Sequence, residues 1–354
     1  MKRLNALWLG SWLSCAPGCA GHAIDLDSSA PPAGSGASAG VAPEITQLHS
    51  PVQDFWADDA RVYWTLPPPG SASPTYGCVF SQCATTLVTY ATQSLAPSDW
   101  MLPLGDDIFF NPGESMVVRC PKTGCVGAPT QVLRDIGSWS IDSDGTYLYW
   151  QSLIDIYRCP VADCGDIPEL VARRVRAEDL HVQGSHVFWT TRDDPNAWLL
   201  SAPVDGSELP SVIVSHDASG APPAVEDAGQ SYGFTLDSQR VYWIDTDSQV
   251  RACSLSGCQL GEPTIVPTDA DWKGGLVADA SGLYFFGAYQ VVRYCPSAGC
   301  ATGSAPKAIS TPGTQQFRLT PSYVYWGAGQ ATNSSGESDR AAQWLIYRTP
   351  KPNQ

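Results

Sequence analysis

The chain has 354 residues, of which 43% are hydrophobic and only 16% are charged, so it can bury a large core. Its formal net charge of −15 excludes most nucleic-acid binders, because an acidic surface repels phosphate backbones. Gly (32), Pro (29) and Trp (13) are plentiful, which suits many short strands joined by turns better than helices with charged exposed faces.

The N-terminus has the pattern of an export signal. Lys2 and Arg3 precede an apolar run at 4–13, which is too short to span a bilayer and has the length of a signal-peptide core. Cys15 and Cys19 follow, each behind a small residue, as in bacterial lipoprotein signals. We therefore expect an exported lipoprotein of a bacterial cell envelope, in the outer membrane or periplasm and lipidated at one of these cysteines. A soluble secreted protein is the alternative.

A tether is predicted to follow this leader, which we place at 1–19. Residues 20–42 are rich in Ala, Gly, Ser and Pro and contain almost nothing to bury, as in flexible linkers. The rest of the chain, 43–354, is expected to form one folded domain.

An aromatic triplet recurs along this domain, with a β-branched or aliphatic residue before two aromatic residues. The seven copies are Val62-Tyr63-Trp64, Ile108-Phe109-Phe110, Leu148-Tyr149-Trp150, Val187-Phe188-Trp189, Val241-Tyr242-Trp243, Leu283-Tyr284-Phe285 and Val324-Tyr325-Trp326. Their third residues lie 46, 40, 39, 54, 42 and 41 positions apart. A turn signal such as "DSDGT" precedes most triplets, and two further short runs follow them. Four short strands in each repeat of about 40 residues predict a β-propeller blade.

Seven triplets predict an all-β, seven-bladed β-propeller of four-stranded blades. The last repeat is incomplete, since only the run "WLIYRTP" follows its triplet, while a strand-like segment at 43–51 precedes the first repeat. We expect 43–51 to pair with 343–349 and close the ring, which removes the exposed strand edges at the seam.

The repeats resemble the YWTD-type propellers of low-density-lipoprotein-receptor relatives. The best copies of the motif are residues 187–214 and 241–258. That family usually has six blades, and its Asp after the aromatic pair is found here only at Asp245. The resemblance implies a propeller with a binding role.

Ten of the twelve cysteines form five Cys-x4-Cys pairs, each at the turn between the third and fourth strands of a repeat. The pairs are Cys78/Cys83, Cys120/Cys125, Cys159/Cys164, Cys253/Cys258 and Cys295/Cys300. Residues that flank a four-residue hairpin loop have Cα atoms roughly 4.5–5.5 Å apart, within the range of a disulfide. Zinc sites prefer Cys-x2-Cys pairs that converge or have histidines nearby, and the five histidines are scattered. We predict five disulfides, which suits an exported protein, with no metal and no cofactor.

All long insertions fall in the second-to-third and fourth-to-first connections, which share one face because propeller strands alternate in direction. The insertions are 66–75, 190–197, 216–230 and 327–343. The candidate contact residues on this face are Arg192, Asp193, Asp194, Asp217, Glu226, Asp227, Glu337, Asp339 and Arg340. Seven of the nine are acidic, which favours a cationic or polyhydroxylated partner.

No local pattern identifies a catalytic group, so we expect a non-enzymatic, monomeric binding or scaffold protein. Its long-loop face would meet a protein or glycan, with no nucleic-acid partner and with membrane contact only through the lipid anchor. The alternative is an exported polysaccharide hydrolase or lyase with carboxylates on the same face, because propeller enzymes often carry catalytic residues that no local motif reveals.

Overall fold

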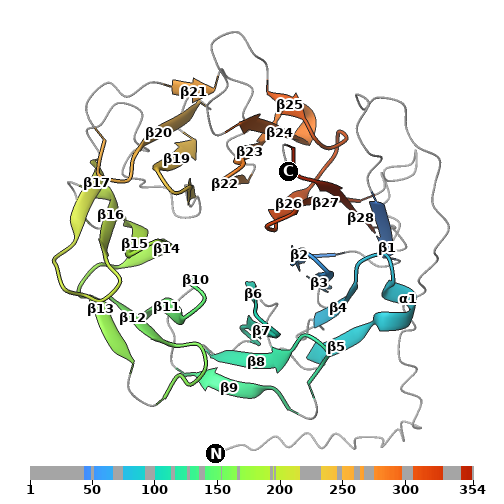
Figure 1. Cartoon of the computed structure of the whole chain (residues 1–354), viewed down its shortest axis with the longest axis horizontal. Coiled ribbons are helices and arrows are strands. Elements are labelled where there is room, and N and C mark those ends of the chain that lie inside the picture. Colours follow the sequence, from blue (N-terminus) through green and yellow to red (C-terminus); the bar gives the residue numbers. More distant parts are fainter. Residues whose placement is uncertain are drawn as a thin grey trace, which may run out of the picture.

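Seven four-stranded antiparallel sheets are arranged as blades around a central axis in the computed structural model (Figure 1). The structure describes residues 44–48, 52–66, 75–91, 100–112, 116–125, 128–134, 140–152, 154–165, 168–191, 194, 197–215, 233–244, 249–258, 264–266, 275–296, 306–329 and 344–352. The predicted leader, with Cys15 and Cys19, and the predicted tether at 20–42 lie outside these residues. No helix in the described part of the chain is long and apolar enough to cross a membrane.

Each blade runs from an innermost first strand to an outermost fourth strand. Blade 1 contains β2 (Asp54–Ala57), β3 (Arg61–Thr65), β4 (Thr75–Val79) and β5 (Val88–Ala91), and blade 2 contains β6 (Met101–Leu104), β7 (Asp107–Phe110), β8 (Val117–Pro121) and β9 (Thr130–Leu133). Blade 3 contains β10 (Ile141–Ser143), β11 (Tyr147–Ser152), β12 (Asp155–Pro160) and β13 (Glu169–Ala172). Blade 4 contains β14 (Ala177–Gln183), β15 (His186–Thr191), β16 (Ala197–Pro203) and β17 (Ser211–Ser215). Blade 5 contains β18 (Phe234–Leu236), β19 (Arg240–Ile244), β20 (Val250–Ser254) and β21 (Thr264–Val266). Blade 6 contains β22 (Leu276–Asp279), β23 (Gly282–Gly287), β24 (Val291–Pro296) and β25 (Lys307–Ala308). Blade 7 contains β26 (Gln316–Leu319), β27 (Tyr323–Gly329), β28 (Trp344–Pro350) and, as its outermost strand, β1 (Glu44–Leu48).

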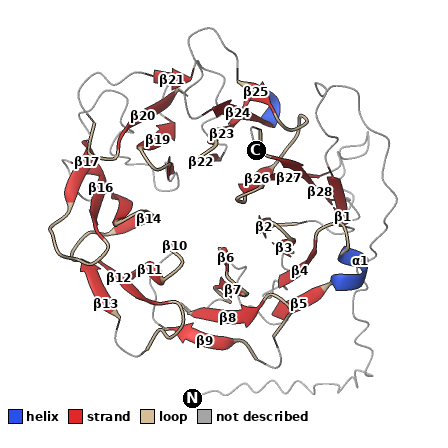
Figure 2. Cartoon of the chain, in the orientation of Figure 1, coloured by secondary structure: helices blue, strands red, loops and turns tan. Residues whose placement is uncertain are grey.

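Helical turns occur at two connections of the described chain, and the sequence pattern did not indicate either of them. The α1 turn (Cys83–Thr86) lies between β4 and β5, and the 3₁₀ turn η1 (Ala288–Gln290) lies between β23 and β24. Figure 2 shows how small this helical share is beside the strands. The prediction of an all-β ring with seven blades is therefore confirmed, and the blade number differs from the six that are usual for YWTD-type propellers.

The aromatic triplets lie on the second strands and form the cores between blades. Successive side chains of a strand point to opposite faces, so the middle aromatic contacts the next blade while its two neighbours contact the previous one. Tyr149 of blade 3, for example, packs with Val187 and Trp189 of blade 4. The same arrangement joins blade 7 to blade 1 through Tyr325 and Trp64 and recurs at the other five interfaces. Each triplet thus contributes to two cores.

The ring is closed by the N-terminal strand. β1 pairs with β28 in antiparallel register, from Glu44 opposite Arg348 to Leu48 opposite Trp344. In Figure 1 the blue β1 lies beside the red β28, so segments from opposite ends of the chain complete one blade. This confirms the predicted closure, with the strand covering 44–48 of the expected 43–51 segment.

Four of the predicted disulfides are formed within the described chain. They are Cys78–Cys83, Cys120–Cys125, Cys159–Cys164 and Cys253–Cys258, with Cα–Cα distances of 4.9 to 5.1 Å. Cys295 is also disulfide-bonded, and its predicted partner Cys300 lies outside the described residues. The hairpin spacing that predicted these bonds is thus the spacing that the fold adopts.

Candidate functional site

The predicted binding face is the one reached by the second-to-third and fourth-to-first connections, and we call it the long-loop face. The antiparallel strand order places the ends of β3, β15, β17 and β27 on this face. Among the nine candidate contact residues, only Asp194 is described; it is half-buried between β15 and β16. Eight candidates lie outside the described residues: Arg192, Asp193, Asp217, Glu226, Asp227, Glu337, Asp339 and Arg340. Their role stays a prediction.

An exposed aromatic residue on the long-loop face was missed by the sequence analysis. Tyr289 lies in η1, the second-to-third connection of blade 6, and its side chain is 86% exposed. Its backbone and that of Gln290 are left-handed, with φ of 62° and 56°. Such a conformation costs about 1–3 kcal/mol for a non-glycine residue and tends to occur at functional sites. The two left-handed positions are Tyr289 and Gln290 rather than Gly or Asn, so no sequence signal predicted this conformation.

A neighbouring loop holds this left-handed turn in place. The backbone N–H groups of Gly313 and Thr314 donate to the carbonyl oxygens of Tyr289 and Gln290, each at 3.1 Å. Thr314 is fully buried, and its hydroxyl contacts the Ser310 hydroxyl at 2.9 Å. Hydrogen bonds from the β25–β26 connection therefore hold the turn from which the ring of Tyr289 projects to solvent.

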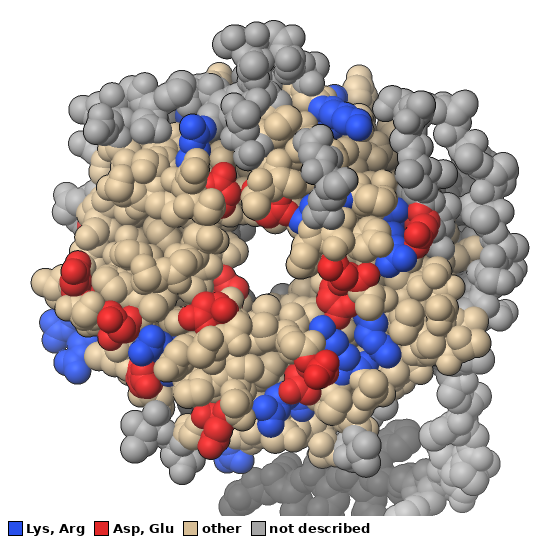
Figure 3. Space-filling view, viewed as in Figure 1, with Lys and Arg blue, Asp and Glu red and all other residues tan. Residues whose placement is uncertain are grey.

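The centre of the ring carries charged groups on its innermost strands. Figure 3 shows an opening through the molecule with acidic side chains on its rim. His181 of β14 forms ion pairs with Asp142 of β10 (Nδ1 to Oδ2, 3.6 Å) and with Asp179 of its own strand (Nε2 to Oδ1, 3.7 Å). Its ring also meets Phe234 of β18 edge-on, with centroids 4.9 Å apart. These residues connect blades 3, 4 and 5 across the innermost strands.

The protonation state of His181 argues against a role as a catalytic base. Burial by itself lowers its pKa, but the charge of Asp179 and a hydrogen bond with Asp142 raise the pKa to about 10. For the carboxyl of Asp179, burial raises the pKa, but the positive charge of His181 outweighs burial and lowers the pKa below its ordinary value. The imidazole is therefore protonated at neutral pH and cannot accept another proton. Its positive charge instead connects carboxylates of two blades.

This ion pair predicts a specific pH dependence of stability. Because folding raises the pKa of His181 above its ordinary value, its stabilisation is fully present below pH about 6.5 and is lost as pH rises toward 10. Since 39% of the side chain is exposed, we discount the shift for solvent screening and expect about 1–2 kcal/mol.

Urea unfolding at pH 6, 8 and 10 measures this effect. Between pH 6 and pH 10 the wild type should lose more unfolding free energy than His181→Gln. The variant serves as the control, because it still contains every other group that titrates in this range. Parallel pH curves for the two proteins would contradict the assignment.

The first-to-second turns of blades 1, 3 and 5 share a carboxylate–phenol contact that explains their turn signals in the sequence. In blade 3, Asp144 Oδ1 accepts hydrogen bonds from the Thr146 and Tyr147 N–H groups, while Oδ2 accepts the Tyr149 hydroxyl at 2.7 Å. The same contact joins Asp58 to Tyr63 (2.9 Å) and Asp237 to Tyr242 (2.6 Å). Where the middle aromatic is phenylalanine, at Phe109 and Phe188, the residue five positions earlier is Leu104 or Gln183. Blades 6 and 7 differ, because the Tyr284 hydroxyl contacts Ser281, which bonds to Asp279, and Thr320 stands five positions before Tyr325. These carboxylates therefore serve the turns, and the spacing of Asp and Tyr was the signal that the sequence analysis overlooked.

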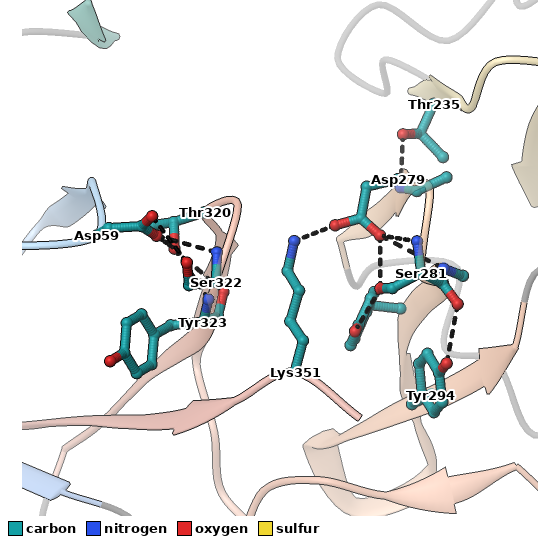
Figure 4. Close-up of polar contacts among 12 residues, drawn as sticks. Asp59, Thr235, Asp279, Ser281, Tyr294, Thr320, Ser322, Tyr323 and Lys351 are labelled. Carbon is teal, nitrogen blue, oxygen red and sulfur yellow. Dashed lines mark hydrogen bonds and ion pairs between the residues drawn. The ribbon is translucent and has the colours of Figure 1, made fainter. Parts of the chain in front are cut away.

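Two further carboxylates connect blade 7 to its neighbours, as Figure 4 shows. Lys351, just after β28, pairs through Nζ with Asp279 of blade 6, and its side chain is only 3% exposed. On the other side, Asp59 of blade 1 accepts hydrogen bonds from the hydroxyl groups of Thr320 and Ser322. Within the described chain, no group of three or more His, Cys, Asp or Glu side chains is arranged to hold a metal ion.

Comparison with known proteins shows the fold. No family model and no curated protein matches the sequence. The chain is similar to YCF48 bound to D1 peptide (10% identity, 90% of this chain and 98% of that chain covered, TM-score 0.53). It is also similar to the computationally designed Ika8 protein (9% identity, 84% of this chain and 96% of that chain covered, TM-score 0.51). A weaker similarity links it to BamB from Moraxella catarrhalis (12% identity, 82% of this chain and 83% of that chain covered, TM-score 0.47). At these identities the similarity to YCF48 and Ika8 shows the fold alone, a β-propeller.

Proposed function

We propose that this protein is a non-enzymatic binding propeller of an oxidising compartment, and that its long-loop face meets a protein or glycan partner. The observation that carries the proposal is Tyr289, which is almost fully exposed on that face and held by a strained, hydrogen-bonded turn. The solved complex of YCF48 with a peptide, on a similar fold, supports a protein partner by analogy. The disulfides support an oxidising compartment.

The surface around Tyr289 suits a partner that offers both apolar and hydrogen-bonding groups. The exposed residues beside Tyr289 in η1 and in the β25–β26 connection are all uncharged: Ala288, Gln290, Thr311, Pro312, Gly313 and Gln315. A tyrosine ring buries a large apolar area with little loss of conformational entropy, while amide and hydroxyl neighbours adapt their hydrogen bonds to the partner. The acidic residues predicted on the long loops would add affinity for a cationic or polyhydroxylated surface.

Tethering to the cell envelope is the second part of the proposal. Cys15 or Cys19 would carry the lipid, and residues 20–42 would give the ring freedom to reach its partner. Labelling of the full chain with a fatty acid, compared between Cys15→Ser and Cys19→Ser, tests which cysteine is modified.

Replacing Tyr289 with alanine is expected to weaken partner binding about tenfold or more, as for aromatic anchors at protein interfaces. The partner is first captured from envelope extract or found on a glycan array, and its affinity for each variant is then measured by biolayer interferometry. Leu209→Ala is the matched control, because Leu209 is 87% exposed but lies in the β16–β17 turn on the opposite face.

Two results would overturn the proposal. Equal affinities of Tyr289→Ala and Leu209→Ala would remove Tyr289 from the binding site. Release of reducing ends from a polysaccharide, lost when Asp193, Asp194, Glu337 and Asp339 are replaced with alanine, would identify an enzyme instead.

A further inference from the structure

The turn after the third strand of a blade contacts the outermost strand of the preceding blade. In blade 5, the backbone N–H of Cys258 donates to the Ile213 carbonyl of β17 at 2.9 Å. In blade 2, the Lys122 carbonyl accepts the hydroxyl of Tyr90 of β5 at 2.6 Å. The disulfide-bonded turns therefore not only close their own hairpins but also form contacts between neighbouring blades.

In blade 1 this contact falls on the strand that closes the ring. The blade that precedes it is blade 7, whose outermost strand is β1. The backbone N–H of Ser81 donates to the Thr46 hydroxyl of β1 at 3.0 Å, and Thr46 is 5% exposed. Cys78 and Cys83 lie in the same buried cluster as Leu48 of β1. The disulfide-bonded turn thus packs directly on β1.

The aromatic residue of this turn extends the contact to β27 and β28. Phe80 is 2% exposed and meets Tyr325 edge-on, with ring centroids 5.4 Å apart. The guanidinium of Arg348 lies over the Phe80 ring at 4.4 Å. Phe80 and Ser81 together therefore contact three of the four strands of blade 7: β1, β27 and β28.

The conformation of the turn depends on a local constraint. Ser81 has a left-handed backbone with φ of 62°, which is unfavourable for a residue with a side chain. The Cys78–Cys83 bond closes the turn on both sides of Ser81, with the Cα atoms 4.9 Å apart. Because this bond limits the alternatives open to the turn, it keeps the Ser81 N–H directed at β1.

We propose that the Cys78–Cys83 disulfide is a clasp for ring closure that forms in an oxidising compartment. The bond forms when the two thiols of the protein pass two electrons and two protons, through a mixed disulfide, to the disulfide form of a dithiol carrier, which leaves as the dithiol. Without the bond the turn relaxes and β1 loses the hydrogen bond from Ser81, while its pairing with β28 and the burial of Leu48 remain. Ring closure is thereby coupled to an oxidising compartment, a property separate from partner binding on the long-loop face.

Hydrogen exchange measured by mass spectrometry on the full chain tests the clasp. Cys78→Ala/Cys83→Ala should accelerate amide exchange over residues 44–48 at least about tenfold, with smaller changes in blades 2 to 5. The control is Cys159→Ala/Cys164→Ala, which removes a bond with the same sequence separation. That turn packs against Leu133 of β9, away from the seam, and its loss should leave exchange over 44–48 within about twofold of wild type.

A second variant covers the case in which the first does not fold. Thr46→Val removes only the acceptor of the Ser81 N–H and keeps all disulfides, so it should also accelerate exchange over 44–48 and leave blade 3 unchanged. Equal acceleration over 44–48 in both disulfide variants would overturn the proposal, because the effect would then be general. Unchanged exchange over 44–48 in Cys78→Ala/Cys83→Ala or in Thr46→Val would overturn it as well.

Discussion

Replacing Asp279 with asparagine is expected to destabilise the folded protein by about 3–5 kcal/mol, because it leaves a buried ammonium without its counter-charge. Lys351 Nζ contacts Asp279 Oδ2, and only 3% of the lysine side chain is exposed. The other carboxylate oxygen, Oδ1, accepts hydrogen bonds from the Ser281 N–H and hydroxyl at 2.8 and 2.6 Å (Figure 4). Asparagine keeps an oxygen for these bonds, so the substitution removes the charge and leaves the turn intact.

Urea unfolding at neutral pH measures this cost, and two variants separate its causes. Lys351→Met combined with Asp279→Asn should recover most of the lost stability, since an apolar side chain then replaces the unpaired ammonium. Asp237→Asn is the matched control, because Asp237 occupies the equivalent turn of blade 5 and bonds to the Tyr242 hydroxyl rather than to a lysine. Equal costs for Asp279→Asn and Asp237→Asn would show that the turn, and not the ion pair, determines the effect.

Acid should weaken the same contact. Burial raises the pKa of Asp279, but the bonds from Lys351 and Ser281 outweigh it and lower the pKa below its ordinary value. A lowered pKa means that this stabilisation is present above pH about 4 and is lost as pH falls further.

Replacing Arg348 with alanine is expected to cost about 3 kcal/mol, from two cation–π contacts and the hydrogen bonds of the guanidinium. The guanidinium lies between the rings of Phe80 (4.4 Å) and Tyr323 (4.5 Å) and pairs with Glu44 of β1 at 2.5 Å. It also donates to the Asp59 carbonyl of blade 1 at 3.3 Å. One side chain therefore joins β28, β1 and blade 1 at the seam.

Blade 3 provides an internal control for this residue. Arg158 pairs with Glu169 at 2.6 Å and lies 4.3 Å from the Tyr147 ring, but the chain runs continuously through its blade. Arg158→Ala should therefore cost at least about 1 kcal/mol less than Arg348→Ala, since it loses one cation–π contact fewer. Arg348→Lys should restore only part of the stability, because lysine lacks the planar group that stacks between two rings. Equal unfolding free energies for the two alanine variants would contradict a special role of the seam.

The fold could be predicted closely because its determinants are local and repeated. A triplet such as Leu148-Tyr149-Trp150, a turn signal before it and two short runs after it suffice to define a blade. The Cys-x4-Cys spacing determines its disulfides in the same way, because a short hairpin brings its flanking residues together. Even the closure of the ring followed from counting strands, since the last repeat lacked one and β1 had no other blade to join.

The contacts that give the ring its particular properties were decided by the tertiary structure. His181 meets Asp142 of another blade, Lys351 meets Asp279 across 72 positions, and Arg348 meets Asp59 across 289. The turn that exposes Tyr289 likewise accepts hydrogen bonds from a separate loop. The alternation of hydrophobic residues and the choice of turn residues determine structure within a few residues of the chain. These pairings instead depend on how the seven similar blades are oriented relative to one another. Only the closed ring brings such distant side chains within bonding distance.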